Sequence, residues 1–155
     1  MRRLAGLILV ALGIALAGCA GPGSAPPFVS VTISPVPQGF ARIYFFRDWE
    51  PYESLSRPWI RLNGNAAAIS EPGGVSFRDV PPGPYVISVD SQGTYFNQTK
   101  TALLGPGDTI YVKILSLWSW DRGFAWTRDT FVVALVWEPQ ARAEIERLHY
   151  FEAQP

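Results

Sequence analysis

The fold is decided by one short stretch of the sequence, Ile60-Arg61-Leu62-Asn63-Gly64. Apolar and charged residues alternate in its first half, which indicates a strand with one buried face. The Asn-Gly pair in its second half is a strong hairpin signal, because a tight type I′ turn needs positive φ at both central residues. Residues 66–70 are the expected return strand. The stretch therefore predicts an antiparallel hairpin.

The same alternation recurs on both sides of this hairpin. Further strands are expected at residues 41–46, 75–80, 85–89, 98–104, 110–114 and 131–137. Segments rich in proline and glycine at 81–84 and 105–108 predict turns between them. Residues 131–137 are apolar on both faces, as expected for a central strand covered on each side. Frequent turn signals favour a mainly β fold, a single antiparallel β-sandwich.

One helix is predicted at the C-terminal end, after all the predicted strands. Glu138-Pro139 suits a helix start, since proline at the first position loses no hydrogen bond and an acid favours the positive end of the dipole. Arg142 and Glu146 are spaced to pair on the solvent side. The apolar face, which we expect to pack on a sheet, consists of Ala141, Ile145 and Leu148.

Composition indicates one folded domain behind a short leading segment. The chain has 155 residues, of which 48% are hydrophobic, so a core can form. The 13 basic residues balance the 13 acidic ones, and positive charge is not clustered, which argues against a nucleic-acid partner. With a single cysteine, no internal disulfide can form.

The N-terminus has the three parts of an export signal. Arg2 and Arg3 are followed by an uncharged stretch, residues 4–17, which is shorter than the roughly 20 residues of a transmembrane helix. Leu16-Ala17-Gly18-Cys19 then resembles the bacterial lipobox. The resemblance implies cleavage between Gly18 and Cys19, a diacylglyceryl group on the thiol and a further acyl chain, such as palmitate, on the new amino terminus.

Two plainer interpretations of Cys19 remain: a small residue near an ordinary secretory cleavage site, or part of an uncleaved helix. The combined pattern favours the lipoprotein, with residues 1–18 as signal peptide. Two or three acyl chains anchor a protein stably, whereas one holds it only marginally. Ala20 stands where aspartate often signals inner-membrane retention, which favours the periplasmic face of the outer membrane.

Residues 19–39 are expected to form the lipidated cysteine and a tether. Residues 21–27 are rich in glycine and proline and show no hydrophobic period. Residues 28–33 alternate briefly and are either a docked edge strand or more linker. Fully extended at about 3.1 Å per residue, residues 20–39 would reach roughly 60 Å. The folded domain is then residues 40–155.

The order of several loose motifs resembles domain of unknown function 2846, a family of bacterial, often lipid-anchored, proteins. The matching stretches are residues 41–47, 60–64, 77–83, 85–88, 105–108, 110–114 and 137–138. The resemblance covers nearly the whole folded domain and implies a transthyretin-like sandwich. It implies no reaction, and it supplies no catalytic residue.

Residues 118–126 are the least ordinary part of the domain. Asp121-Arg122-Gly123 predicts a hairpin tip, with Trp118 and Trp120 on one face of a strand and Trp126 across from them. As a hypothesis, this aromatic strip binds a partner protein, a glycan or the lipid interface. The alternative, favoured somewhat because a small domain needs core volume, is that these rings fill the sandwich.

Catalytic and metal chemistry find little support in the sequence. The one histidine, His149, is expected at the surface or its boundary, and no metal or other cofactor is predicted. No serine stands in a nucleophile-elbow context. Acid–base work would need two carboxylates in one pocket. The candidates are Asp48, Glu50, Glu53 and Asp79.

Three functions therefore compete. The leading one is a non-enzymatic envelope lipoprotein, anchored through Cys19, whose sandwich binds or positions something, most plausibly a protein of the envelope. The second is a hydrolase acting on cell-wall or glycan material. The third is a structural accessory subunit of an envelope complex. A concave pocket with two carboxylates would favour the hydrolase, and an exposed tryptophan face would favour binding.

Overall fold

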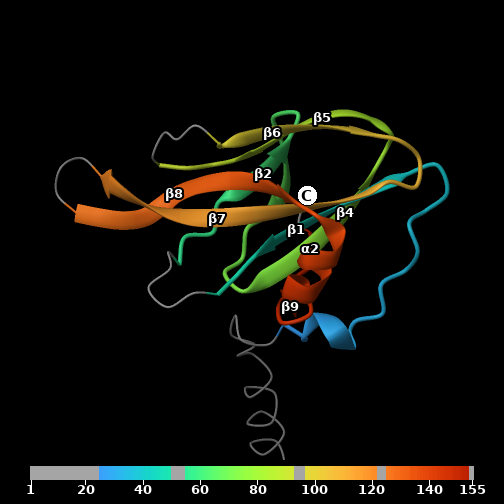
Figure 1. The fold of residues 1–155 in the computed structure, drawn as a ribbon, viewed down its shortest axis with the longest axis horizontal. Coiled ribbons are helices and arrows are strands. Elements are labelled where there is room, and N and C mark those ends of the chain that lie inside the picture. The colour runs from blue at the N-terminus through green and yellow to red at the C-terminus, as the bar shows by residue number, and fades with distance from the viewer. Residues whose placement is uncertain (1–24, 50–54, 93–96, 122–124, 154–155) are drawn as a thin grey trace, which may run out of the picture.

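The computed structural model describes residues 25–49, 55–92, 97–121 and 125–153 (Figure 1); at 118–121 and 125–129 only the backbone is described. Strands make up most of the described residues, which contain a single α-helix near their C-terminal end. The elements are η1 (Phe28–Ser30, a 3-10 turn), β1 (Ala41–Arg47), β2 (Trp59–Leu62), β3 (Asn65–Ile69), β4 (Gly74–Val80), β5 (Gly83–Val89), β6 (Thr99–Leu104), β7 (Thr109–Asp121), β8 (Ala125–Val136), α2 (Glu138–Ile145) and β9 (His149–Tyr150).

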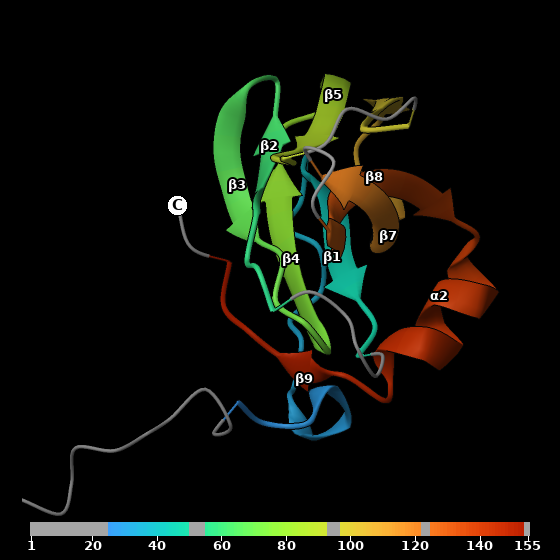
Figure 2. The ribbon, with the colours of Figure 1, turned by 90° about the vertical axis from the view of Figure 1, so that its left-hand side faces the viewer.

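Two sheets face one another, with α2 on the outer side of the larger one (Figure 2). The strand order is β8-β7-β1-β4-β9 in the larger sheet and β3-β2-β5-β6 in the smaller. The β-sandwich with a C-terminal helix is therefore confirmed. Most neighbouring strands are antiparallel, but β1 pairs with β7, and β4 with β9, in parallel.

Alternate residues of the facing strands build the interior between the sheets. The side chains at 43 and 45 of β1 point into it, whereas those at 44 and 46 pack on the opposite face with the helix. Burying each large side chain contributes about 1.5–3 kcal/mol. The largest fully buried apolar side chains between the sheets are Phe45, Phe131, Ile43, Ile60, Ile87 and Ile114.

The predicted hairpin is present between β2 and β3. Asn63 and Gly64 have φ of 51° and 83°, the left-handed values that a type I′ turn requires. The Asn63 side chain also holds the neighbouring strand, because its Oδ1 accepts a hydrogen bond from the N–H of Val86 at 2.8 Å. The turn therefore fixes the register of β2 against both β3 and β5.

The prediction that residues 131–137 form a central strand is wrong. Residues 131–136 belong to β8, which lies at the edge of the larger sheet, and Trp137 is the N-cap of α2. Two residues outside the sheet bond to its edge: the N–H of Phe131 donates to Ser91 Oγ (3.0 Å) and that of Val133 to the carbonyl of Asn97 (2.8 Å). Beyond this cover the strand is open, and Leu135 is 46% exposed.

The helix packs on the outer face of the larger sheet, as predicted. Ala141 and Ile145 are buried against it together with Leu148, which follows the helix. The expected pair of Arg142 with Glu146 is wrong: Arg142 Nε instead donates to Glu138 Oε1 at 2.7 Å. The acid one turn earlier also lies at the positive end of the helix dipole. No helix in the described ranges has the length and apolar character to cross a bilayer.

The segment before β1 is held to the domain at residues 26–28 and again at Ser34. The segment at 28–33 is docked but is not a strand; it begins with the 3-10 turn η1. The N–H of Phe28 donates to the carbonyl of Leu148, and the N–H of Tyr150 to that of Pro26, both at 2.8 Å. The Phe28 ring meets the Tyr44 ring edge-on, with centroids 6.3 Å apart. The N-terminal segment and β9 therefore form one clasp at one end of the sandwich (Figure 1).

Candidate functional site

The two residues of the predicted cleavage and lipidation site, Gly18 and Cys19, lie outside the described residues. The described chain begins at Ala25 and enters the domain at the clasp formed by Pro26 and Phe28. Only six residues, 20–25, separate Cys19 from that clasp.

The tryptophan-rich segment forms the far end of the β7–β8 hairpin. Trp120 pairs with Trp126 across the strands, as predicted, and Asp121 pairs with Ala125, so the connection spans residues 122–124. Trp118 lies where the register shifts between Leu117 and Ser119. The side chains of the three tryptophans lie outside the described residues. Whether these rings share a face, or fill the core, stays a prediction.

This hairpin projects beyond its neighbours in the larger sheet (Figure 1). The last residue of β7 that pairs with β1 is Lys113, opposite Phe46, whereas β7 continues to Asp121. The interior between the sheets is meanwhile closed by apolar side chains from the other strands and from the inner halves of β7 and β8, which include Ile114 and Phe131. The hairpin therefore offers an arm on which a partner can be held.

The candidate carboxylates do not come together. Asp48 pairs with Lys113 beyond the end of β1, and Asp79 pairs with Arg42 near its start. Asp79 lies beside Arg42 in the sheet, and six residues of extended chain, about 20 Å, separate Arg42 from Asp48. Glu50 and Glu53 lie outside the described residues. Among the described residues, no pocket joins two of the four acids.

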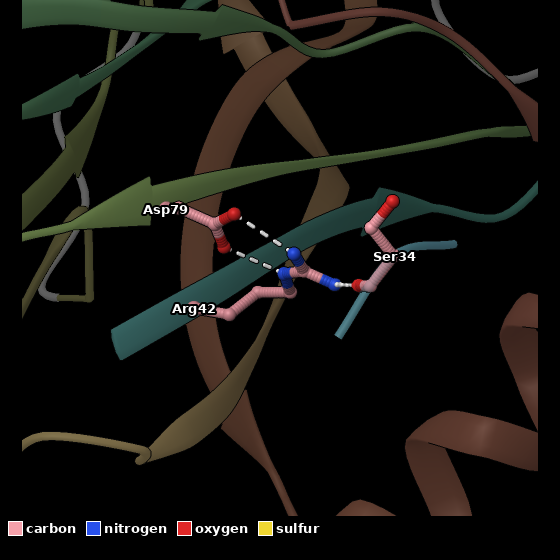
Figure 3. A network of polar contacts seen from close by, with 3 residues as sticks. All are labelled: Ser34, Arg42 and Asp79. Atoms are coloured by element: carbon pink, nitrogen blue, oxygen red, sulfur yellow. Dashed lines mark hydrogen bonds and ion pairs between the residues drawn. The ribbon is translucent and has the colours of Figure 1, made fainter. Parts of the chain in front are cut away.

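Arg42 is the centre of a polar network on the outer face of the larger sheet (Figure 3). Its guanidinium donates to both Asp79 oxygens, at 2.6 and 2.8 Å, and to the carbonyl of Ser34 at 2.7 Å. It also lies over the Phe77 ring, 4.1 Å from the centroid. The hydrogen bond to Asp79 raises the pKa of Arg42 despite burial. The network fastens the N-terminal segment to β1 and β4.

Lys113 joins three elements through two carboxylates. Its Nζ contacts Asp48, which follows β1, and Glu144 of α2, at 2.7 Å from the latter. Burial lowers the pKa of Lys113, but the hydrogen bonds to both acids outweigh that effect and raise it. For Glu144, burial raises the pKa, and hydrogen bonds from Lys113 and Gln140 lower it overall. Lys113 and the two carboxylates can be half-buried because their opposite charges neutralise one another.

Tyr111 lies beside this cluster and stacks on Tyr44, with centroids 5.1 Å apart. Burial raises its pKa to about 12, so the phenol stays protonated at any physiological pH. A hydroxyl with such a pKa is a poor acid or base catalyst near neutrality. Its role is to pack between the sheet and α2.

Arg47 is a second buried cation that the sequence pattern did not reveal. It is 1% exposed, donates to the carbonyl of Ser56 at 2.8 Å, and lies 4.9 Å from the centre of the Phe131 ring. Arg42 and Arg47 stand within a strand whose seven residues are all buried. The available signal was an arginine at each end of an otherwise apolar strand.

A hollow of about 370 Å³ lies next to the clasp. His149 is on its rim and is exposed, which confirms the prediction for this residue. Within the described ranges no group of three histidine, cysteine or acidic residues can hold a metal ion. The residues that line the hollow are Ala25, Trp49, Pro72, Gly73, Arg147, Leu148, His149 and Phe151.

The charged side chains described above all take part in contacts within the fold. Each charged cluster holds elements of the fold together. The features that remain accessible at the surface are the β7–β8 hairpin and the hollow at the clasp. The chain matches no protein-family profile, no curated protein and no solved structure. The resemblance to domain of unknown function 2846 stays a prediction.

Proposed function

We propose that this chain is a lipid-anchored lipoprotein of a bacterial envelope whose β-sandwich holds a protein partner without catalysing a reaction. The observation that carries the proposal is the order of its parts. A lipobox-like Leu16-Ala17-Gly18-Cys19 stands directly before a short linker and a complete sandwich. Such an order places a water-soluble module at a membrane surface. We assign the protein to the outer membrane because Ala20 stands where aspartate often signals retention in the inner membrane.

The arm formed by β7 and β8 is the part of the sandwich that suits the partner. It extends past the strand pairing of β1, and its far end is rich in tryptophan. Tryptophan combines large apolar area with a polar N–H, which is why it is enriched at the centres of protein interfaces. The proposal therefore assigns partner contact to Trp118, Trp120 and Trp126.

The anchor is tested by replacing its thiol. In cells fed a labelled fatty acid, the native chain should take up label and sediment with membranes after a carbonate wash. Cys19→Ser should lose the label and move to the soluble fraction. A Cys19→Ser protein that still resists the wash refutes the lipoprotein.

The partner is tested by photo-crosslinking in the intact envelope. A photoreactive residue at Trp126 should trap a discrete envelope protein, whereas the same residue at Arg61, on the other sheet, should not. Trapping at neither position, or equally at both, contradicts a hairpin interface. A product that forms only within one large stable assembly would instead indicate a structural accessory subunit.

A hydrolase is not favoured by any contact of the described residues. Asp48 and Asp79 are paired with different cations at separate places on the sheet. Acid–base chemistry needs two such groups converging on one substrate bond.

A further inference from the structure

The place where the tether leaves the domain is fixed by backbone hydrogen bonds. Pro26 accepts from Tyr150 and Phe28 donates to Leu148, each at 2.8 Å, and Pro27 bridges to His149. Arg42 holds the same segment further along through the carbonyl of Ser34. The chain therefore departs from one defined end of the sandwich, beside β9 (Figure 2).

The free part of the tether is short. Residues 20–25 are six residues, and at 3.3–3.6 Å each they span at most about 20 Å. The docked residues 26–39 remove most of the roughly 60 Å that the sequence allowed. If Cys19 is lipidated, as the proposed function states, the clasp end must lie within about 20 Å of the lipid headgroups.

The surface at that end has the side chains of a bilayer interface. Trp49 is 62% exposed beside the hollow, and Val29, in the turn at the clasp, is 68% exposed. Arg147 and His149 stand on the rim of the same hollow. Tryptophan is enriched at headgroup level, and arginine donates to phosphate oxygens. With a lipid on Cys19, the short connection would bring this end of the sandwich close to the bilayer surface.

We propose that the clasp end of the sandwich rests on the bilayer, with Trp49 and Val29 at headgroup level and Arg147 toward lipid phosphate. This inference rests on the proposed anchoring at Cys19. It gives the molecule a fixed orientation, in which one end of the sandwich is occupied by lipid and cannot take a protein partner.

The test uses the single cysteine of the chain. Because lipidation consumes the Cys19 thiol, a second cysteine is the only reactive thiol in the mature protein. Trp49→Cys and Val29→Cys each carry an environment-sensitive fluorophore at the clasp end. Trp137→Cys is the matched control, because this residue is 76% exposed and stands between α2 and β8, the edge strand opposite β9 in the larger sheet.

Each full-length lipidated variant is placed in phosphatidylcholine–phosphatidylglycerol vesicles, with and without a headgroup-region nitroxide lipid. Nitroxide should quench the label at 49 and 29 at least twofold and leave the label at 137 within about a tenth of its value. Equal quenching at all three positions overturns the orientation while the protein still floats with the vesicles. Failure to float overturns the anchoring as well, which separates the two proposals.

Discussion

Asp79 allows Arg42 to be buried. The guanidinium is almost inaccessible to water, and its neutralisation depends on two hydrogen bonds to a single carboxylate. A buried cation that loses its partner keeps its desolvation cost, so breaking such a pair destabilises more than forming it stabilises. The same guanidinium holds the N-terminal segment, which links this residue to the place where the tether leaves the domain.

We expect Asp79→Asn to lower the free energy of unfolding by about 3 kcal/mol, the lower end of the range for a broken buried pair. Urea denaturation followed by circular dichroism measures this change. Asp90→Asn is the control, because it breaks a similar bidentate pair with Arg61 that is open to solvent. The control should leave the midpoint nearly unchanged. Equal losses in both variants would contradict the importance of burial.

The sequence predicted which side chains are buried better than it predicted which side chains form pairs with one another. Alternation placed Ile43, Phe45 and Ile87 inside, because burial follows the period of the strand. It could not pair Arg42 with Asp79, since that contact depends on which strands are neighbours. For the same reason Arg142 was assigned to Glu146, although both Glu146 and Glu138 are four residues away and only the tertiary setting decides.

The helix is joined to the sheet by charge as well as by apolar contact. Glu144 of α2 reaches Lys113 of β7, and Ile145 beside it is buried. The pKa of Glu144 is lowered, so its contribution to stability is present above its usual value of 4.5 and is lost as the pH falls through the lower folded value.

We expect Glu144→Gln to cost about 1.5 kcal/mol at pH 7, the range for a hydrogen bond between charged groups. The cost should shrink as the pH falls below 4.5 and through the lower pKa of the folded protein, because the native carboxylate is then protonated as well. Thermal unfolding at pH 7, 5 and 3 measures it. Glu146→Gln, which removes the same charge from an exposed position, should keep the native pH dependence. A cost independent of pH would show that the ion pair is not its source.

Strands and the helix could be predicted because each has a local period, but their neighbours could not. The strands at 41–46 and 110–114 were expected, yet their parallel pairing joins segments far apart in the sequence. β9 was missed because two residues carry no period. Residues 131–137 were taken as central because both faces are apolar. Both faces are apolar because Phe131 and Val133 pack between the sheets, whereas Val136 packs against the cluster that includes the helix.

At the scale of the whole molecule, the N-terminal segment belongs to the fold. A chain that begins at Gly39 should be less stable than one that begins at Ala25 by about 2–3 kcal/mol. It loses two backbone hydrogen bonds, near 1 kcal/mol each, and the ring contact of Phe28 with Tyr44. Denaturation of the two truncated chains measures this difference. Equal stabilities would show that the segment does not contribute to the stability of the fold.

The sequence predicted the sandwich, which the structure confirms, whereas the export signal stays a prediction and the contacts of Pro26 and Phe28 with the domain were not predicted. Glycine and proline suggest a tether, but their flexibility in isolation does not exclude docking. The docking partners are Leu148 and Tyr150, more than a hundred residues away, so no local pattern could reveal them. The tryptophan arm was recognised from its turn residues, and its backbone pairing agrees with that prediction.

The clasp also determines which part of the molecule opens first under mechanical force. In the proposed function, tension between a lipid at Cys19 and a bound partner would enter the fold at Pro26 and pull first on its hydrogen bond to Tyr150 and on that of Phe28 to Leu148. These few bonds yield before the long ladder between β1 and β4. Once these bonds and the hydrogen bond of Arg42 to Ser34 are broken, residues 26–39 can extend, and the sandwich can move tens of ångströms from the bilayer while it remains folded.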